Sequence, residues 1–255
     1  MADIKPNPRP RCVLIVAPHP DDAEFMAGGT LSYWQSLGAS IHFLLVTDGI
    51  SGSRDPDHTP DQLAATRREE QRAAARVYGS DDVTFLGYPD GRVEPSLELR
   101  WDIARVIRRV RPDVLVVMDP YFRYGENYIN HPDHIAVAEA ALAAIMPVAN
   151  TRLAALDLLA EGLEPHDVRE VYLSMAVNTT VWIPLTEQDM ERKIEALRAH
   201  ASQIGQWAEA EQVVRDWARR GAEDARAHGI ECEYAERFAY VRLRPDEEEQ
   251  PVGEG

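Results

Sequence analysis

Cysteine is scarce in this sequence, since Cys12 and Cys232 are the only two among 255 residues. Two cysteines so far apart exclude a disulfide scaffold and a cysteine-rich zinc site, and we interpret both as small buried hydrophobic residues. Long apolar runs are also lacking. No stretch approaches the roughly 18 apolar residues of a membrane span, and residues 1–10 lack the apolar core of a signal peptide. The sequence therefore predicts a cytoplasmic protein with no membrane partner.

Positive charge is in the minority: 27 lysines and arginines stand against 43 aspartates and glutamates, which gives a formal net charge of -16 and a pI near 4.9. This balance excludes a basic surface for nucleic acids or anionic membranes. A Gly-x-Gly-x-x-Gly dinucleotide fingerprint is missing too, because Gly28 and Gly29 lie well inside a helical pattern. What is present, 45% hydrophobic and 27% charged residues, is typical of an ordinary globular protein.

Apolar runs alternate with helical patterns through the first 150 residues. The runs predict buried strands, and they cover 13–16, 41–46, 83–86 and 114–118. The helical patterns lie between and after them, at about 25–37, 63–78, 97–110 and 134–146. This alternation predicts the α/β class, with a Rossmann-like, mostly parallel sheet and helices on both of its faces.

The pattern changes after residue 150, where shorter elements follow. Helices are expected at 153–163, 187–203 and 206–228, and strands at 171–175, 180–183 and 239–243. We interpret residues 1–255 as a single domain. It has a core of 11–150, a C-terminal strand and helix extension of 151–244 packed on that core as a wall, and a disordered acidic tail of 245–255.

A histidine and two carboxylates directly follow the first strand, in the segment Ala17-Pro18-His19-Pro20-Asp21-Asp22-Ala23-Glu24. In open α/β sheets, ligands bind at the carboxyl ends of strands. A second cluster, His131-Pro132-Asp133-His134, comes after the strand 114–118 and opens another helix. Its two histidines lie one helical turn apart and therefore face the same way. We predict that the two clusters form one metal site.

The residue types of these clusters suit a catalytic zinc ion, which takes nitrogen and oxygen ligands and keeps one position free for water. His19, Asp22 and one histidine of the second cluster would supply three ligands, which leaves the other histidine for proton transfer or charge stabilisation. In the pair Asp21-Asp22, one carboxylate can bind the metal while its neighbour acts as general base. The site predicts hydrolysis of an amide or ester. A mobile flap at 50–61 and the loop 119–130 would border it.

The two clusters resemble those of the PIG-L/LmbE-like family of zinc-dependent N-deacetylases. Further segments support the resemblance over residues 11–243, namely Thr47-Asp48-Gly49, Arg67-Arg68-Glu69-Glu70, Leu86-Gly87-Tyr88-Pro89-Asp90-Gly91 and the run 193–203. The resemblance implies removal of an N-acetyl or other N-acyl group from an N-acetylglucosamine-type amino sugar or glycoside. It also implies one catalytic Zn2+ ion, for which Fe2+ could substitute, and a small N-acyl amino sugar as partner. A homo-oligomer is compatible with it.

The resemblance assigns roles within the clusters. His19, Asp22 and His134 become the zinc ligands, and Asp21 becomes the general base. His131 becomes the imidazole that stabilises the tetrahedral intermediate or protonates the leaving amine.

Three further residues receive supporting roles. Asp133 is expected to orient an imidazole from behind the metal ligands, and Arg67 and Asp90 match positions that hold sugar hydroxyls or a phosphate-like group. The residues alone leave alternatives open: Arg67 could be an exposed helix residue paired with Glu70, and Asp90 an ordinary turn residue. A late-helix residue such as His200 is expected to be structural.

One position departs from the family pattern. Some relatives carry a tyrosine two residues before the first histidine of the second cluster, where it assists the oxyanion. Ile129 occupies that position here, and Tyr128 lies one residue earlier. The partner of the oxyanion is therefore left open.

Other functions fit parts of the same pattern. A zinc amidase acting on a thiol conjugate or another N-acyl metabolite would share every catalytic residue. A non-catalytic metal-binding domain would not need Asp21 or His131, since neither is required merely to hold zinc. A magnesium phospho-receiver would explain Asp21-Asp22 but would leave the two histidines of the second cluster without a role.

Overall fold

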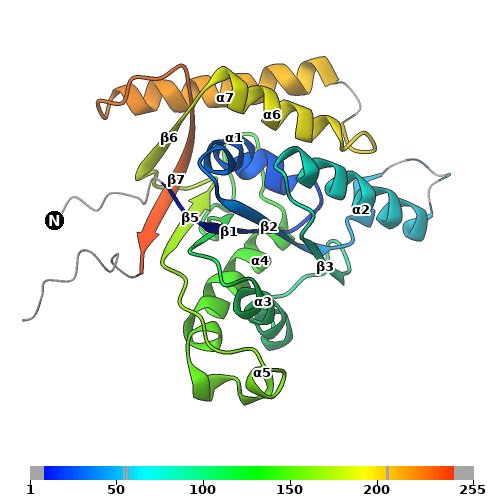
Figure 1. Ribbon diagram of the computed structural model, residues 1–255. Coiled ribbons are helices and arrows are strands. Elements are labelled where there is room, and N and C mark those ends of the chain that lie inside the picture. Colours follow the sequence, from blue (N-terminus) through cyan, green and yellow to red (C-terminus); the bar gives the residue numbers. More distant parts are fainter. Residues whose placement is uncertain (1–8, 54, 56, 58, 205–206, 244–255) are drawn as a thin grey trace, which may run out of the picture.

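Seven strands form the sheet, which occupies the middle of the molecule (Figure 1). In the computed structural model, the described residues are 9–53, 55, 57, 59–204 and 207–243. The strands are β1 (Cys12–Ala17), β2 (Ser40–Thr47), β3 (Val83–Tyr88), β4 (Val114–Met118), β5 (Glu170–Ser174), β6 (Val181–Leu185) and β7 (Tyr234–Arg242). Their order in the sheet is β3-β2-β1-β4-β5-β7-β6, and only the pairings of β7 with β5 and β6 are antiparallel.

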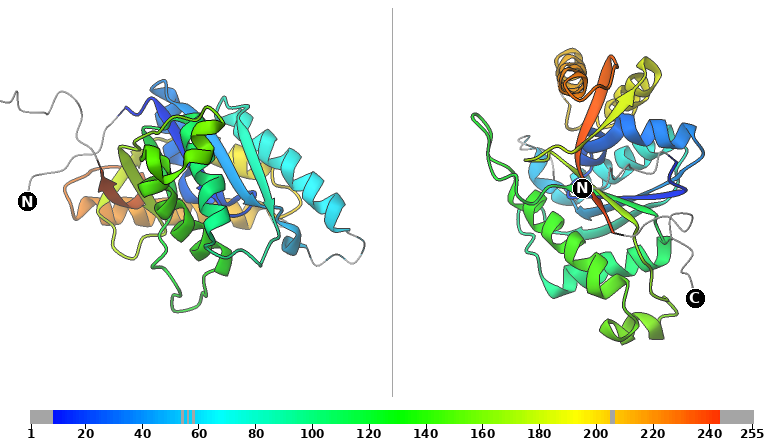
Figure 2. Two further views of the ribbon diagram at one scale, coloured as in Figure 1. Left: turned by 90° about the horizontal axis from the view of Figure 1, so that it is seen from below. Right: turned by 90° about the vertical axis from the view of Figure 1, so that its left-hand side faces the viewer.

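Helices cover both faces of this sheet (Figures 1 and 2). They are α1 (Asp22–Ser36), α2 (Pro60–Val77), α3 (Leu97–Val110), α4 (Pro132–Ala143), α5 (Leu156–Ala160), α6 (Glu187–Arg198) and α7 (Trp207–Arg226). On one face lie α1 and α2, with α6 packed on both, while α3 and α4 lie on the other face. The predicted α/β class with a Rossmann-like, mostly parallel sheet is confirmed.

The chain reverses its direction across the sheet at β1. From β1 it moves outward through β2 to the edge strand β3, and α3 then carries it back to β4 on the other side of β1. The connections after β1 and β4 therefore diverge, and this is the place where open α/β sheets form a ligand-binding crevice. Both predicted clusters lie there, because residues 18–21 follow β1 and the loop 119–131 follows β4.

The C-terminal part contributes β5, β7 and β6 to the same sheet as the first four strands. The division into a core of 11–150 and a wall of 151–244 within one domain stays a prediction. The acidic tail of 245–255 lies outside the described residues, as do positions 54, 56 and 58 of the expected flap. Within that flap, Ile50–Gly52 forms a short 3-10 turn.

One helical stretch, Pro132–Ala149, is long and apolar enough to cross a membrane by length and composition alone, with a mean hydropathy of 1.2. This stretch is longer than the helix predicted at 134–146. The helix α4 begins two residues before the expected start at His134, and a π turn (Ala144–Ala149) continues it. Of this stretch, 61% is buried inside the protein, and α4 packs on β1, β4 and α3. It has the burial of a core helix.

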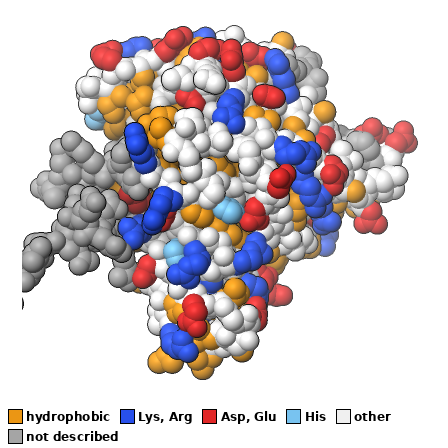
Figure 3. All heavy atoms as spheres, viewed as in Figure 1, with side chains coloured by type: hydrophobic (Ala, Val, Ile, Leu, Met, Phe, Trp, Pro, Cys, Tyr) orange, Lys and Arg blue, Asp and Glu red, His pale blue; other side chains and the backbone are white. Residues whose placement is uncertain are grey.

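Charged side chains of both signs are interspersed over the face seen in Figure 3. On the part of this face that the structure describes, basic side chains do not form one broad patch of the kind that nucleic acids bind.

The helix α1 is broken after its first turn. Ala27 has φ -152 and ψ 18, outside the helical region. The freed N–H groups of Gly29 and Thr30 donate to the Glu236 carboxylate of β7, at 3.0 and 2.8 Å. Lys193 of α6 pairs with Glu236 at 2.6 Å and donates to the Phe25 carbonyl at 3.1 Å. This buried pair fixes the orientation of the first turn of α1, which carries Asp22.

Candidate active site

The turn after β1 has an unusual backbone. Asp21 adopts φ 96 and ψ -29, a left-handed conformation that residues with a side chain rarely take. Its N–H donates to Gln71 Oε1 of α2 at 3.1 Å. Such a conformation persists only where the surroundings impose it, and it then points to a functional site.

His19 is held by three carboxylates. Its Nδ1 lies 2.9 Å from Asp22 Oδ2, and its Nε2 lies 3.2 Å from both Asp133 Oδ2 and Asp90 Oδ1. Asp133 is itself fixed, because it accepts the N–H groups of Gly91 at 2.7 Å and Val93 at 3.2 Å. Burial opposes the charged ring, but the three carboxylates raise the pKa of His19.

His134 points to the same carboxylate oxygen as His19. Its Nε2 lies 3.3 Å from Asp22 Oδ2, and its Nδ1 lies 2.9 Å from Asn130 Oδ1. The amide oxygen of Asn130 can only accept a hydrogen bond, so it places the ring hydrogen on Nδ1 and leaves the lone pair of Nε2 facing Asp22. Sequence reasoning missed Asn130. Its signal was a polar residue four positions before a proposed ligand.

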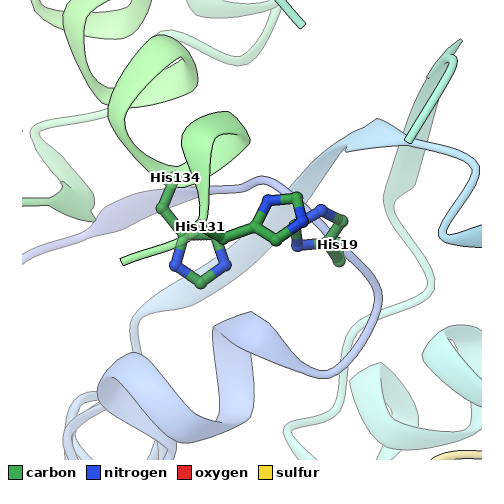
Figure 4. A group of neighbouring side chains, drawn as sticks. All are labelled: His19, His131 and His134. Atoms are coloured by element: carbon green, nitrogen blue, oxygen red, sulfur yellow. The ribbon is translucent and has the colours of Figure 1, made fainter. Parts of the chain in front are cut away.

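His131 differs from the other two histidines in its exposure. Its side chain is 37% exposed, against 10% for His19 and His134. Its Nδ1 accepts the Asp133 N–H at 3.3 Å and caps α4, so a neutral ring carries its proton on Nε2. Burial and the nearby His19 lower the pKa of His131. Figure 4 shows the three rings turned toward one another, and their centroids lie 4.7 to 5.4 Å apart.

These side chains form a group that can hold a metal ion. Donor nitrogens of His19, His131 and His134 lie within 4.8 Å of one another, and His19, His131, Asp90 and Asp133 form a second overlapping group. Asp22 Oδ2 adds an oxygen donor between His19 Nδ1 and His134 Nε2. A mixed set of imidazole and carboxylate donors, with the other ring nitrogens already engaged, fits a catalytic metal.

Asp21 lies beside this group and is held by Arg67 instead of by a histidine. Arg67 Nη2 lies 3.2 Å from Asp21 Oδ2 and also donates to the Pro20 carbonyl, while Nη1 donates to the Gly49 carbonyl at 2.6 Å. Burial and the adjacent Asp22 raise the pKa of Asp21 to about 7, although Arg67 opposes them. A carboxyl with a pKa near neutrality suits a general base.

Arg67 is only 3% exposed. The alternative of an exposed residue paired with Glu70 is wrong, because Glu70 instead accepts both the N–H of Ser202 at 2.8 Å and its hydroxyl at 2.7 Å.

Asp90 is buried between the first cluster and the loop after β2. Its Oδ2 accepts the Ser51 N–H at 2.9 Å, and its own N–H donates to Asp48 Oδ1 at 3.1 Å. Its Oδ1 lies 3.2 Å from His19 Nε2 and 4.0 Å from His131 Nε2. Asp90 is therefore more than a turn residue, since this oxygen faces two of the histidines.

Tyr128 and Ile129 point in different directions. Ile129 is 85% exposed. The Tyr128 hydroxyl lies 3.4 Å from Asn130 Oδ1, and its ring stacks on Phe122. Burial and the Asp22 carboxylate raise the pKa of Tyr128. Because Asn130 Oδ1 also lies 2.9 Å from His134 Nδ1, the Tyr128 hydroxyl lies beside the partner of a proposed metal ligand, even though this tyrosine is one residue out of the expected position.

The crevice at the switch point of a parallel sheet, with histidines and aspartates suited to a metal, is that of a metal-binding α/β protein with a Rossmann-like sheet. The model of the family GlcNAc-PI de-N-acetylase (PIG-L) matches residues 14–145, and the chain belongs to this family. The predicted family is thus confirmed, and with it a hydrolase that acts on N-acetyl amide bonds.

Two relatives and one solved structure illustrate the similarity. The chain is 31% identical over 192 residues to the diacetylchitobiose deacetylase of Thermococcus kodakarensis, covering 75% of this chain and 70% of that protein. It is 28% identical over 206 residues to a probable N-acetyl-alpha-D-glucosaminyl L-malate deacetylase 2 of Bacillus anthracis, covering 76% and 82%. The N,N'-diacetylchitobiose deacetylase from Pyrococcus horikoshii, solved with its inhibitor MPG, is 27% identical with a TM-score of 0.82, covering 94% and 88%.

Proposed function

We propose that this chain uses one zinc ion, held by His19, Asp22 and His134, to remove the acetyl group of an N-acetylglucosamine unit joined to a second group. The observation that carries the proposal is the convergence of His19 Nδ1 and His134 Nε2 on Asp22 Oδ2, at 2.9 and 3.3 Å, beside an Asp21 that binds neither histidine. The names of the relatives support the substrate class, because each acts on an N-acetylglucosamine joined to a sugar or a malate.

Bound zinc supplies a Lewis acid and lowers the pKa of water at the site. Asp21 accepts the proton of the attacking water. Arg67 holds the Asp21 carboxylate in place for this step. As the carbon–oxygen bond forms, the Tyr128 hydroxyl donates to the developing oxyanion. His131 donates a hydrogen bond from its Nε2–H to the tetrahedral intermediate. As the carbon–nitrogen bond breaks, the proton that Asp21 took from the water passes to the nitrogen, and the amine and acetic acid leave.

The remaining residues support these steps. Asp133 and Asn130 each hold one ring nitrogen of a ligand, at 3.2 Å for His19 and 2.9 Å for His134. Asp90 Oδ1, which also lies 3.2 Å from His19 Nε2, accepts a hydrogen bond from a sugar hydroxyl. For Arg67, its burial and its bonds to Asp21 and two carbonyls favour holding the general base over the direct sugar contact expected from the sequence.

The test measures amine release from a panel of N-acetylated substrates: diacetylchitobiose, free N-acetylglucosamine, an N-acetylglucosamine malate glycoside and an N-acyl thiol conjugate. Zinc content is measured on the same preparations. Wild type is compared with Asp21→Asn, and with Asp81→Asn on the surface as a matched control. We expect glycoside turnover by wild type and control, and a zinc-loaded Asp21→Asn whose kcat is about 100- to 10,000-fold lower but still measurable. Turnover of the thiol conjugate alone would overturn the substrate class, and zinc-loaded wild type inert on every compound would favour a metal-binding domain without catalysis.

A further inference from the structure

We propose that Gln71 is a positioning residue for Asp21, and that Glu24 and His200 set the orientation of its amide. The inference rests on the proposed function, in which Asp21 is the general base. None of the three residues touches the reacting atoms. They act through the backbone of the catalytic turn.

The helix α2 holds Asp21 at two points. Gln71 accepts the main-chain N–H of Asp21 at 3.1 Å, and Arg67, one helical turn earlier, pairs with its carboxylate at 3.2 Å. Side chains four residues apart lie on one helix face, so α2 binds both the backbone N–H and the carboxylate of Asp21. The left-handed φ of 96 is thereby held by a partner 50 residues along the chain.

The amide of Gln71 has only one orientation that satisfies its neighbours. Its Nε2 donates to Glu24 Oε1 at 2.9 Å, and Glu24 Oε2 lies 3.2 Å from His200 Nε2. An ionised carboxylate only accepts hydrogen bonds, so Glu24 draws the NH2 group of Gln71 toward itself and leaves the amide oxygen for Asp21. All three side chains are 0% exposed, which excludes water as a ready substitute.

The consequence of this arrangement lies in the separation of the two neighbouring carboxylates. Asp22 faces His19 and His134, whereas Asp21 faces Arg67. Without the acceptor on Gln71, the part-buried N–H of Asp21 loses its partner, and the turn relaxes toward a conformation that satisfies it. Asp21 then moves relative to the attacking water, while the metal ligands stay fixed by their own contacts.

The first experiment is a double-mutant cycle of Gln71→Leu with Asp21→Asn, with Gln212→Leu on the surface of α7 as a matched control. We expect Gln71→Leu alone to lower kcat about 10- to 100-fold, with KM and zinc content unchanged. In the Asp21→Asn background it should lower the residual kcat no further, since the group through which it acts is already lost. An equal loss in both backgrounds would overturn the proposal and show a general structural role.

A second experiment keeps the test open if Gln71→Leu folds poorly. Gln71→Glu alone places two carboxylates against each other and should be strongly impaired. Combining it with Glu24→Gln exchanges donor and acceptor, so that the Asp21 N–H and His200 Nε2 again find oxygen partners. We expect the pair to recover most of the kcat, and no recovery would overturn the proposal. Full activity of Asp21→Asn would instead refute the proposed function, whereas a strongly impaired Asp21→Asn beside a fully active Gln71→Leu would refute only this inference.

Discussion

The two histidine-bearing turns of the crevice are held to very different degrees. The turn after β1 is buried. Its Pro18 carbonyl accepts a hydrogen bond from Thr47 of β2, and its Asp21 N–H donates one to Gln71 of α2. The turn before α4 follows a loop whose Ile129 is 85% exposed, and the His131 side chain is 37% exposed. The turn after β1 is therefore held by contacts from several elements, whereas the turn before α4 is exposed on one side.

This difference separates two tasks. A metal and a general base require groups held within a fraction of an ångström, which buried and fully bonded side chains provide. A group that meets the substrate must instead be accessible. His134 belongs to the first task although it shares a helical turn with His131, because Asn130 and Asp22 engage both of its ring nitrogens.

The largest effect is expected from the loss of His134, a buried ligand on the otherwise open turn. We expect His134→Ala to lose bound zinc and to lower amine release by about 1000-fold or more, because the ion supplies both activated water and charge stabilisation. Elemental analysis and the deacetylase assay measure the two effects, and His42→Ala, a surface change on β2, is the control. Full zinc content in His134→Ala would remove this residue from the ligand set.

His131→Ala tests whether the two histidines of one helical turn have different roles, His134 as a metal ligand and His131 as a group that meets the substrate. This variant should keep its zinc and lose about 100- to 1000-fold in kcat, the range for loss of a donor to the tetrahedral intermediate. The measurement is kcat with zinc content on one preparation. Zinc loss would mean that the group of three histidines, and not the pair with Asp22, holds the ion.

Tyr128→Phe tests the open side of the crevice. Removal of one oxyanion donor should lower kcat about 100-fold, with little change in KM. Ile129→Ala is the paired control, and it should leave kcat within about twofold because an exposed side chain makes few contacts. A loss in Ile129→Ala as large as in Tyr128→Phe would point to loop conformation as the cause.

The smallest effect is expected at Asn130. Loss of its amide in Asn130→Ala should weaken zinc affinity about 10- to 100-fold, as measured by competition with a chelator. Asn130→Asp keeps an acceptor for His134 Nδ1 and should retain most of the affinity. Equal affinity in wild type and Asn130→Ala would show that His134 needs no such partner.

Much of the fold could be predicted because the signals are local. The run Val114–Met118 is a strand with the expected bounds, and α3 spans Leu97–Val110 as its spacing indicates. Helix ends were less certain. The helix expected from His134 begins at Pro132, because His131 caps it and proline suits the first helical position.

The clusters of the site were equally local, and the switch point of the sheet brings them together. Their supports were not predictable. Gln71 meets Asp21 across 50 positions of sequence, and Glu236 meets Gly29 across 207. Such contacts depend on how α2, α6 and β7 pack against α1. The hydrophobic periodicity of the sequence predicts these elements but not which of their side chains meet. Asn130 was missed because an amide next to a histidine motif is common in loops.

The Lys193–Glu236 pair that closes the break in α1 also sets an order in time. Residues 14–145, the segment matched by the family, contain every residue of the proposed site, yet the partners of Phe25, Gly29 and Thr30 come from α6 and β7. A chain still on the ribosome thus contains every proposed metal ligand before it contains the Lys193–Glu236 pair. Pulse proteolysis of stalled nascent chains should find residues 19–36 protected only after Glu236 has left the exit tunnel, and earlier protection would contradict this order.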